Sequence, residues 1–465
     1  MTYFFETYGC EMNIAESASV EQLLISRGWT KASDAQLSDV IIINTCSVRA
    51  TAETRIYGRL GFYTGLKKLR NGEPGAKSRN MEIAAEYVQK NGSVPLTIIV
   101  MGCMAERLLK TLQKEWPAVD YVVGTYAKNK FGDIIQAVEN HETPVEIEEE
   151  PVYTFAATSY EEGAFSTFVP IMHGCNNFCT YCIVPYVRGR EVSRPVSQIL
   201  HEIDILSKRG VKEITLLGQN VNSYKDADYR PGGTNFTELL RIISRHIDEI
   251  HSSIEWIRFE SSNPKDFSDE LIDLIANDRH ICRGLHIAVQ HGSTRVLKAM
   301  NRRYTRESYM ELVDKLKSRI PDLALTTDIM LGFPGETEQD FEEVVSLMQK
   351  VQYESAFMYY YNPREGTPAA KMENQIDMET KKARLQKIID MQLDITKKVM
   401  SARVGQTVKV LADIVSRDNK EELLGKTEQN ERVAFKGAVS LIGTFVNVHI
   451  DSLNGNTFKG TVLKA

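Results

Sequence analysis

Short apolar runs alternate with helical periodicity along the first 140 residues. A 3.6-residue spacing of apolar positions predicts a helix from Ala15 to Arg27. The runs that read as buried strands are Tyr3–Glu6, Val40–Ile43, Thr97–Val100 and Tyr121–Val123. Strands and helices in alternation are typical of a parallel sheet with helices on its faces. We therefore expect an α/β domain over residues 1–140.

The same alternation returns in residues 164–400, after an acidic stretch at 141–163 that we interpret as a linker. Pro195 opens an amphipathic helix that ends at Gly210, and a long charged helix spans Met378 to Met400. The expected strands are Glu213–Leu217, Ile254–Phe259, Leu285–Val289, Ala324–Leu331 and Ser355–Tyr360. About six βα units predict a partial (β/α) barrel, with its site at the C-terminal ends of the strands.

The pattern changes again in residues 401–465, where short alternating strands are separated by glycine turns. These strands are Thr407–Asp413, Glu421–Thr427, Val433–Phe435, Thr444–Asp451 and Thr457–Val462. Five short strands in about 60 residues predict a small antiparallel barrel of the kind that binds oligonucleotides.

Composition narrows the class of protein. The chain has 465 residues, 42% of them hydrophobic and 25% charged, and its net charge is −6. No apolar run reaches the ~18 residues of a membrane span, and Met1 leads directly into a strand, so we expect a cytoplasmic protein with no membrane contact. We also expect a monomer, although no pattern in the sequence indicates the oligomeric state. Seven cysteines, an odd number, favour metal ligation in a reducing compartment over a disulfide framework. Because the net charge is negative, a surface that binds nucleic acid would have to be a local basic patch.

Three cysteines, Cys175, Cys179 and Cys182, follow the apolar run Phe168–Met172. Three thiolates at this spacing suit an iron–sulfur cluster or a zinc ion, and both usually take four ligands. Since no fourth cysteine or histidine follows nearby, an open coordination position indicates a catalytic centre. The alternative is that the three are buried apolar residues.

This C-x3-C-x2-C spacing resembles the signature of the radical S-adenosylmethionine (SAM) enzymes. The resemblance implies a 4Fe–4S cluster whose open iron binds SAM, and an electron from the cluster that cleaves SAM to a 5′-deoxyadenosyl radical. It also implies SAM contacts from polar residues after two strands, namely Gly218, Gln219, Asn220, Glu260 and Ser261. Taken singly, such residues are also typical of turns and caps. His291 is expected to be structural.

Cys10, Cys46 and Cys103 each stand just after a predicted strand of the first domain. Because the C-terminal ends of parallel strands meet along one edge, the three thiols could meet in space; the alternative is three buried structural thiols. Their motifs resemble those of the methylthiotransferase N-terminal domain, which implies a second 4Fe–4S cluster that supplies or carries sulfur. Cys46 and Cys103 are farther apart than is usual in that family. The extra length, Gly65–Pro95, begins with a basic run that is either a solvated loop or an arm that touches phosphate.

The C-terminal residues resemble a TRAM domain, an RNA-binding module. Its expected basic side comprises Lys409, Arg417, Lys426, Arg432 and Lys436. Nearer the site, Arg188, Arg190 and Arg194 follow the cysteine triplet, and arginine can pair with phosphate or stack on an unpaired base. We expect this cluster to meet RNA; the alternative for each residue is an ion pair with a neighbouring carboxylate.

These three regions, in this order and over the whole chain, resemble the domains of the radical SAM methylthiotransferase family. Asn44–Arg49, Cys182–Glu191 and Leu217–Tyr224 are closest to the branch that modifies isopentenyl-adenosine in tRNA. The resemblance implies 2-methylthiolation of N6-isopentenyladenosine in a tRNA anticodon stem-loop, with two 4Fe–4S clusters, SAM, and an electron donor such as flavodoxin or ferredoxin. The alternatives are action on threonylcarbamoyl-adenosine tRNA, action on a ribosomal-protein aspartate, and a non-catalytic iron–sulfur RNA-binding protein. We expect Cys282 to be no ligand, because it precedes a strand.

Overall fold

The computed structural model describes residues 1–47, 50–73, 80–142 and 153–463. The chain forms two compact units, one of Met1–Asn176 with Ile183–Arg194 and one of Asn177–Cys182 with Pro195–Ala465. Three features of the sequence lie outside the described residues: the acidic run Glu146–Glu150, the basic residues Lys77–Arg79, and the end of the second cysteine motif, Val48-Arg49. The predicted division into domains at residues 140, 163 and 400 stays a prediction.

The first unit is built on a five-stranded sheet in the order β2-β1-β3-β4-β5. Its strands are β1 (Thr2–Thr7), β2 (Thr30–Lys31), β3 (Val40–Thr45), β4 (Thr97–Gly102) and β5 (Tyr121–Val123). Every pairing is parallel, as the sequence predicted.

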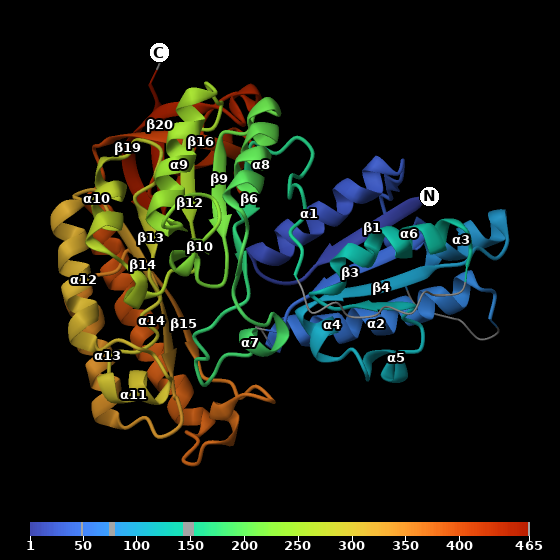
Figure 1. Cartoon of the computed structure of the whole chain (residues 1–465), viewed down its shortest axis with the longest axis horizontal. Helices are drawn as coiled ribbons and strands as arrows, with labels where there is room; N and C mark the ends of the chain where they lie inside the picture. The colour runs from blue at the N-terminus through green and yellow to red at the C-terminus, as the bar shows by residue number, and fades with distance from the viewer. Residues whose placement is uncertain (48–49, 74–79, 143–152, 464–465) are drawn as a thin grey trace. The chain divides into compact units, whose positions relative to one another are not determined.

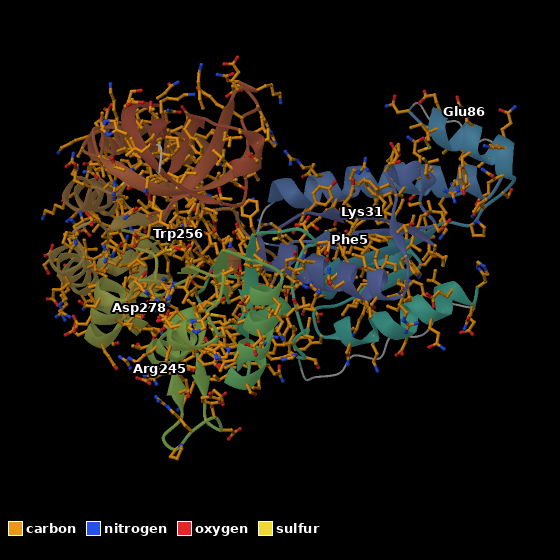
Figure 2. The ribbon with its side chains drawn as sticks, turned by 90° about the horizontal axis from the view of Figure 1, so that it is seen from above. Phe5, Lys31, Glu86, Arg245, Trp256 and Asp278 are labelled. Atoms are coloured by element: carbon orange, nitrogen blue, oxygen red, sulfur yellow. The ribbon has the colours of Figure 1, made fainter. Side chains whose placement is uncertain are left out.

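Alternate residues of the strands bury opposite faces of this sheet. Ile41 and Ile43 of β3 pack with the helices of one face, and Val40 and Ile42 pack with those of the other. The first face is covered by α2 (Ala50–Arg70), α3 (Glu82–Asn91), α4 (Cys103–Arg107) and α5 (Leu112–Glu115), and the second by α1 (Glu11–Ser26) and α6 (Phe131–Glu139) (Figure 1). Figure 2 shows Phe5 on β1 and the exposed Glu86 on α3. Strands covered on both faces are apolar throughout, which explains the unbroken run at 40–43.

The rest of this unit contains short elements. They are η1 (Ala35–Leu37), η2 (Ala127–Lys130), β6 (Ser166–Pro170), β7 (Met172–His173), α7 (Val184–Val187) and β8 (Val192–Ser193). The strand expected at Phe168–Met172 is thus two strands, and the second pairs antiparallel with β8.

The second unit contains five parallel strands in sequence order. They are β9 (Glu213–Leu217), β12 (Trp256–Phe259), β13 (Gly284–His286), β14 (Ala324–Leu331) and β15 (Ser355–Tyr360). β9 pairs with β12 and β13–β14–β15 form a sheet, while bridges such as Ile257↔Ile281 join the two groups. Helices alternate with these strands (Figure 1): α8 (Val196–Lys208), α9 (Phe236–Glu249), α10 (Asp269–Asn277), α11 (Thr294–Ala299), α12 (Arg306–Arg319), α13 (Glu338–Val351) and α14 (Met378–Ser401). The predicted partial barrel is confirmed.

Side chains fix where several of these helices begin. Thr305 and Thr337 form capping boxes at the first turns of α12 and α13, and Ser268 and Asp377 cap α10 and α14. Pro195 lies at the N-cap of α8 rather than at its first helical position. Short elements complete this region: η3 (Val221–Ser223), β10 (Lys225–Asp226), β11 (Thr234–Asn235), η4 (Pro264–Asp266) and η5 (Pro368–Lys371).

The C-terminal strands close into a small barrel in the order β16-β17-β18-β20-β19. Its elements are β16 (Thr407–Val415), β17 (Glu422–Thr427), β18 (Arg432–Lys436), η6 (Val439–Leu441), β19 (Phe445–Asn454) and β20 (Thr457–Val462). The prediction of an antiparallel barrel needs one correction, because β18 and β20 pair in parallel. Strand direction cannot alternate all the way around a closed ring of five, so one parallel pairing is required.

The small barrel packs on the N-terminal ends of the larger barrel's strands. Arg258 of β12 donates to the carbonyl oxygens of Thr427 and Glu428, both at 2.7 Å. Trp256, labelled in Figure 2, meets the ring of Phe445 edge-on at 4.7 Å. These contacts leave the opposite, C-terminal ends of the strands for the site.

A buried pair of carboxylates lies in this contact and makes stability depend on pH. Burial and, after it, the charge of the neighbouring Glu431 together raise the pKa of Glu354 to about 8. Glu431 itself pairs with Arg403 at 2.7 Å. A carboxyl whose folded pKa lies above its ordinary value of 4.5 binds its proton more tightly when folded, so stability falls as pH rises from about 4.5 to about 8. We expect Glu354→Gln to raise the free energy of unfolding by ~2 kcal/mol at pH 8.5 and by little at pH 5.

The measurement is the melting temperature of both proteins from pH 5 to pH 8.5. Glu421→Gln, which changes an exposed carboxylate of the same small barrel, is the control and should follow the wild-type curve. Parallel curves for wild type and Glu354→Gln would contradict the prediction.

Among the described residues, no helix is both long enough and apolar enough to cross a membrane.

Candidate metal centres

The three N-terminal cysteines lie at one edge of the first sheet. Cys46 and Cys103 directly follow the last residues of β3 and β4. Cys10 comes three residues after the end of β1. These strands are adjacent, with Thr7 opposite Asn44 and Thr45 opposite Gly102. The expected common edge is confirmed; that the cysteines hold a cluster stays a prediction.

Two buried asparagines tie these cysteine segments together. The Asn13 side chain donates to Asn44 Oδ1 at 2.9 Å and to the Thr45 carbonyl at 3.2 Å, and it accepts from the Cys10 amide at 3.2 Å. Asn44 in turn donates to the Asn13 carbonyl at 2.9 Å. Both asparagines are fully buried. They position the backbone that carries Cys10 and Cys46, a role that the sequence analysis missed although an asparagine stands within three residues of each cysteine.

The approach of the third segment requires a glycine. Gly102 has φ +94°, and a Cβ there would lie 2.4 Å from Asn44 Oδ1 and 2.5 Å from the Thr45 carbonyl oxygen. Only a residue without a side chain lets β4 deliver Cys103 beside the asparagine pair.

Two thiols of this edge, Cys46 and Cys103, are buried, and the third, Cys10, is half-buried. Burial is the largest cause that raises the pKa of Cys103 to about 12, and the charges of Glu16, Cys46 and Cys10 act in the same direction. Burial likewise raises the pKa of Cys10. A bound metal deprotonates a coordinating thiol outright, so these buried thiols fit a metal centre better than a reactive nucleophile.

Arg188 supplies a positive charge at this edge. Its Nε donates to Cys103 Sγ at 3.1 Å, and its Nη1 donates to Glu16 Oε1 at 2.7 Å. The side chains of Arg188 and Glu16 are each 3% exposed. The guanidinium lowers the pKa of Cys103 and so favours the thiolate that a cluster needs.

Two of the three arginines that we expect to meet RNA, Arg188 and Arg194, are buried. Arg188 pairs with Glu16, and Arg194 donates to the carbonyl oxygens of Ala156 and Pro170. Only Arg190 is exposed. The alternative of an ion pair with a carboxylate applies to Arg188, and RNA contact stays a prediction that Arg190 carries best.

The residues of the second cysteine triplet belong to different units of the chain. Cys175 belongs to the first, where its amide donates to the Gly189 carbonyl at 3.0 Å. Cys179 and Cys182 belong to the second, and the Cys182 amide donates to the Cys179 carbonyl at 3.0 Å.

Residues after α11 hold the loop that carries Cys179 and Cys182. Asn301 donates to the carbonyl oxygens of Asn177 at 3.1 Å and Phe178 at 2.9 Å. Arg302, one residue later, donates to Cys179 Sγ at 3.4 Å and to the Ala288 carbonyl at 3.0 Å. Each triplet therefore has an arginine that donates to one of its sulfurs, buried at Cys103 and half-buried at Cys179. Neither Asn301 nor Arg302 was expected from the sequence, because both lie about 120 residues from the loop that they hold.

Within the described residues, no three or more histidine, cysteine, aspartate or glutamate side chains converge on a single point that could hold one metal ion. A four-iron cluster does not need such convergence, because each thiolate binds a different iron. The described thiols and their arginine donors thus fit a cluster.

The residues expected to contact SAM lie where predicted along the chain. Gly218, Gln219 and Asn220 follow β9, and Glu260 and Ser261 follow its parallel neighbour β12. Asn222 and Asn263 tie the two loops together with hydrogen bonds of 2.9 and 3.0 Å.

Two features of these loops suit a ligand. Asn220 donates to Asp266 at 3.1 Å, while its buried Oδ1 accepts no hydrogen bond from the described residues. Ser261 has φ +65°, which is uncommon outside glycine. A buried acceptor without a donor at a strand end suits the amino group of a ligand such as SAM.

Two residues that the sequence predicts to be structural are buried. His291 is fully buried and contacts Glu336 at 3.2 Å. Cys282 precedes β13, and burial raises its pKa to about 12 among Arg258, Glu213 and Glu428, at the end where the small barrel packs.

Replacing Cys282 with alanine should therefore leave iron per chain and SAM cleavage unchanged. The small cavity should lower the melting temperature slightly. Iron is measured by a colorimetric assay on the reconstituted protein. A fall in iron content would mean that Cys282 is a ligand.

The chain matches three known families along its length. Residues 2–124 match the uncharacterized protein family UPF0004, residues 169–348 the Radical SAM superfamily, and residues 401–463 the TRAM domain.

Curated relatives align from end to end. A protein of Treponema pallidum (strain Nichols) named tRNA-2-methylthio-N(6)-dimethylallyladenosine synthase is 51% identical over 100% of this chain and 99% of its own. Proteins of the same name from Treponema denticola and Acetivibrio thermocellus are 50% and 40% identical, each over 99% of this chain and over 100% and 91% of their own lengths.

Among solved structures, the radical S-adenosylmethionine methyltransferase TsrM from Kitasatospora setae, with cobalamin and a [4Fe-4S] cluster bound, has a similar fold. Its TM-score is 0.55 at 13% identity, over 79% of this chain and 77% of that one.

Proposed function

Because the chain belongs to the family of tRNA-2-methylthio-N(6)-dimethylallyladenosine synthases, we propose that it places a methylthio group on C2 of N6-isopentenyladenosine, the same dimethylallyl base, beside a tRNA anticodon. The observation that carries the proposal is the pair of cysteine triplets, each with an arginine that donates to one of its sulfurs, in a chain that aligns with these relatives from end to end.

The chemistry explains why two centres are needed. C2 of adenine is an unactivated aromatic carbon without a leaving group, so exchange of hydrogen for sulfur requires a radical. A 4Fe–4S cluster held by Cys175, Cys179 and Cys182 would, with SAM, supply the radical, and a second cluster held by Cys10, Cys46 and Cys103 would supply or carry sulfur. Another SAM molecule would supply the methyl group.

The chain's own residues hold and orient these groups. Asn301 fixes the loop of Cys179 and Cys182, and Arg302 donates to Cys179. Asn220 and the residues beside it at the ends of β9 and β12 would hold SAM. Asn13 and Asn44 keep Cys10 and Cys46 together. Such fixed hydrogen bonds keep the reacting groups in place without reorganisation.

The partner is the anticodon stem-loop of a tRNA that carries N6-isopentenyladenosine. The target base must leave its stack to reach the radical. Lys409, Arg417, Arg432 and Lys436 of the small barrel are exposed and suit phosphate contacts. We further propose that the chain acts as a monomer in the cytoplasm, where its substrate is, with a flavodoxin or ferredoxin as electron donor.

The test is mass spectrometry of tRNA nucleosides and ribosomal proteins from a strain that lacks the gene. We expect loss of 2-methylthio-N6-isopentenyladenosine and accumulation of N6-isopentenyladenosine, with recovery when the gene is restored. Unchanged tRNA with loss of a methylthio group from a ribosomal protein would support the protein-modifying alternative.

A further inference from the structure

The face of the β13–β15 sheet that is turned away from the helices carries a line of aromatic and polar side chains. Tyr309 of α12 donates to the Ile287 carbonyl at 3.4 Å, and Thr327 bonds the same carbonyl at 2.8 Å, so Thr327 faces the helices. Alternate residues point the opposite way. The register places His286 beside Thr326, and Asp328 beside Phe357. This second set lines the inner side of the partial barrel and leads along the strands to their C-terminal ends, where barrel folds place their sites.

Phe357 is unusual on this face because it is 61% exposed. Large apolar side chains exposed alone are common on outer surfaces, but this one lies on the inner side of the barrel among polar groups. The His286 ring lies 5.8 Å from it at an interplanar angle of 63°, which is an edge contact. The phenyl face is therefore available for a flat ligand.

Hydrogen-bonding groups surround this ring. His286 contacts Thr326 at 3.0 Å and Asp328 at 3.5 Å. Gln290, in the left-handed region at φ +67°, accepts from the Tyr359 hydroxyl at 3.0 Å and lies 3.5 Å from Asp328. The side chains of His286 and Asp328 are 21% and 29% exposed, so part of each remains open to a ligand.

The line leads toward the second cysteine triplet. Tyr359 lies two residues beyond Phe357 on β15, and it packs against the same apolar cluster as Tyr181, the residue before Cys182. Two residues of strand span about 6.6 Å, so Phe357 lies one such step farther from Cys182 along the inner face.

We propose that Phe357 is the surface on which the flipped-out adenine stacks, with Asp328 and Gln290 as hydrogen-bonding partners for its edge. This inference rests on the proposed function and adds the residues that recognise the base. A lone aromatic ring among polar groups suits a ligand with a flat face and a hydrogen-bonding edge, which is the chemistry of an unstacked base. A protein partner would require a broader apolar surface.

The test uses the reconstituted full chain and a synthetic anticodon stem-loop that contains N6-isopentenyladenosine. Phe357→Ala should raise the dissociation constant or KM for this RNA roughly ten-fold or more, since a stacked base is worth about that much. SAM cleavage without RNA should be unchanged. Phe357→Tyr, which keeps the ring, should restore affinity, and Phe357→Leu, which keeps only apolar bulk, should restore it in part.

Tyr229→Ala is the control, because it removes another exposed aromatic ring of the same unit, at 43% exposure. It should bind and convert the RNA as wild type does. If wild type forms product and Phe357→Ala matches it in affinity and rate, the inference is overturned and the proposed function stands. If wild type forms no methylthiolated RNA under conditions in which it cleaves SAM, the proposed function is overturned and the inference with it.

Discussion

Replacing Cys175, Cys179 and Cys182 together with alanine should abolish SAM cleavage and remove about half of the iron. Two 4Fe–4S clusters amount to about eight irons per chain, and each triplet should hold one cluster. The described thiols of the two triplets have separate arginine donors, Arg188 at Cys103 and Arg302 at Cys179, so loss of one centre should leave the other intact.

The matched variant replaces Cys10, Cys46 and Cys103 with alanine. It should also lose about half of the iron but still cleave SAM, and it should form no methylthiolated product. Iron analysis, 5′-deoxyadenosine from SAM and modified nucleoside from tRNA are measured on all three proteins. Methylthiolated product from the second variant would refute the division of labour between the triplets.

Arg188→Ala should destabilise the first unit and deplete its metal centre. The substitution takes the guanidinium away from the buried carboxylate of Glu16, and breaking a buried ion pair in this way typically costs about 3–5 kcal/mol. It also removes the donor to Cys103 Sγ and the positive charge that favours the thiolate. We expect a clear fall in melting temperature and less than full iron occupancy.

Arg190→Ala is the control, since it removes an exposed arginine two residues away and should keep both stability and iron. Adding Glu16→Gln to Arg188→Ala removes the buried negative charge and should recover much of the stability, though not the donor to sulfur. Calorimetry and iron analysis of the four proteins are the measurements. An Arg188→Ala protein as stable and iron-rich as Arg190→Ala would contradict this account of the pair.

Much of the fold could be predicted because the strands are short and buried on both faces. The run Val40–Ile43 is apolar at every position, and the structure packs its alternate residues against helices on opposite sides. The edge shared by Cys10, Cys46 and Cys103 followed from the geometry of parallel strands alone.

The parts that could not be predicted depend on contacts between distant residues. From the sequence, Arg188 resembles the surface arginines around it. Only the structure shows that it pairs with Glu16, which lies 172 positions earlier in the chain. Arg302 reaches Cys179 across 123 positions, and the exposure of Phe357 depends on which face of β15 the helices cover. Sequence periodicity reports burial along one element and carries no information on which partner a charged side chain meets.

The return of residues 183–194 to the first unit has a consequence for the order of folding during synthesis. The β1–β5 sheet can form once about 140 residues have been made, but Arg188 is added only about 50 residues later. At the usual ~5–20 residues per second, this takes on the order of 2–10 s. Throughout that interval the guanidinium that pairs with Glu16 and donates to Cys103 has yet to arrive. A fragment cut at residue 140 would be held permanently in this incomplete state, so the N-terminal sheet is a complete folding unit only together with the segment that follows the second cysteine triplet.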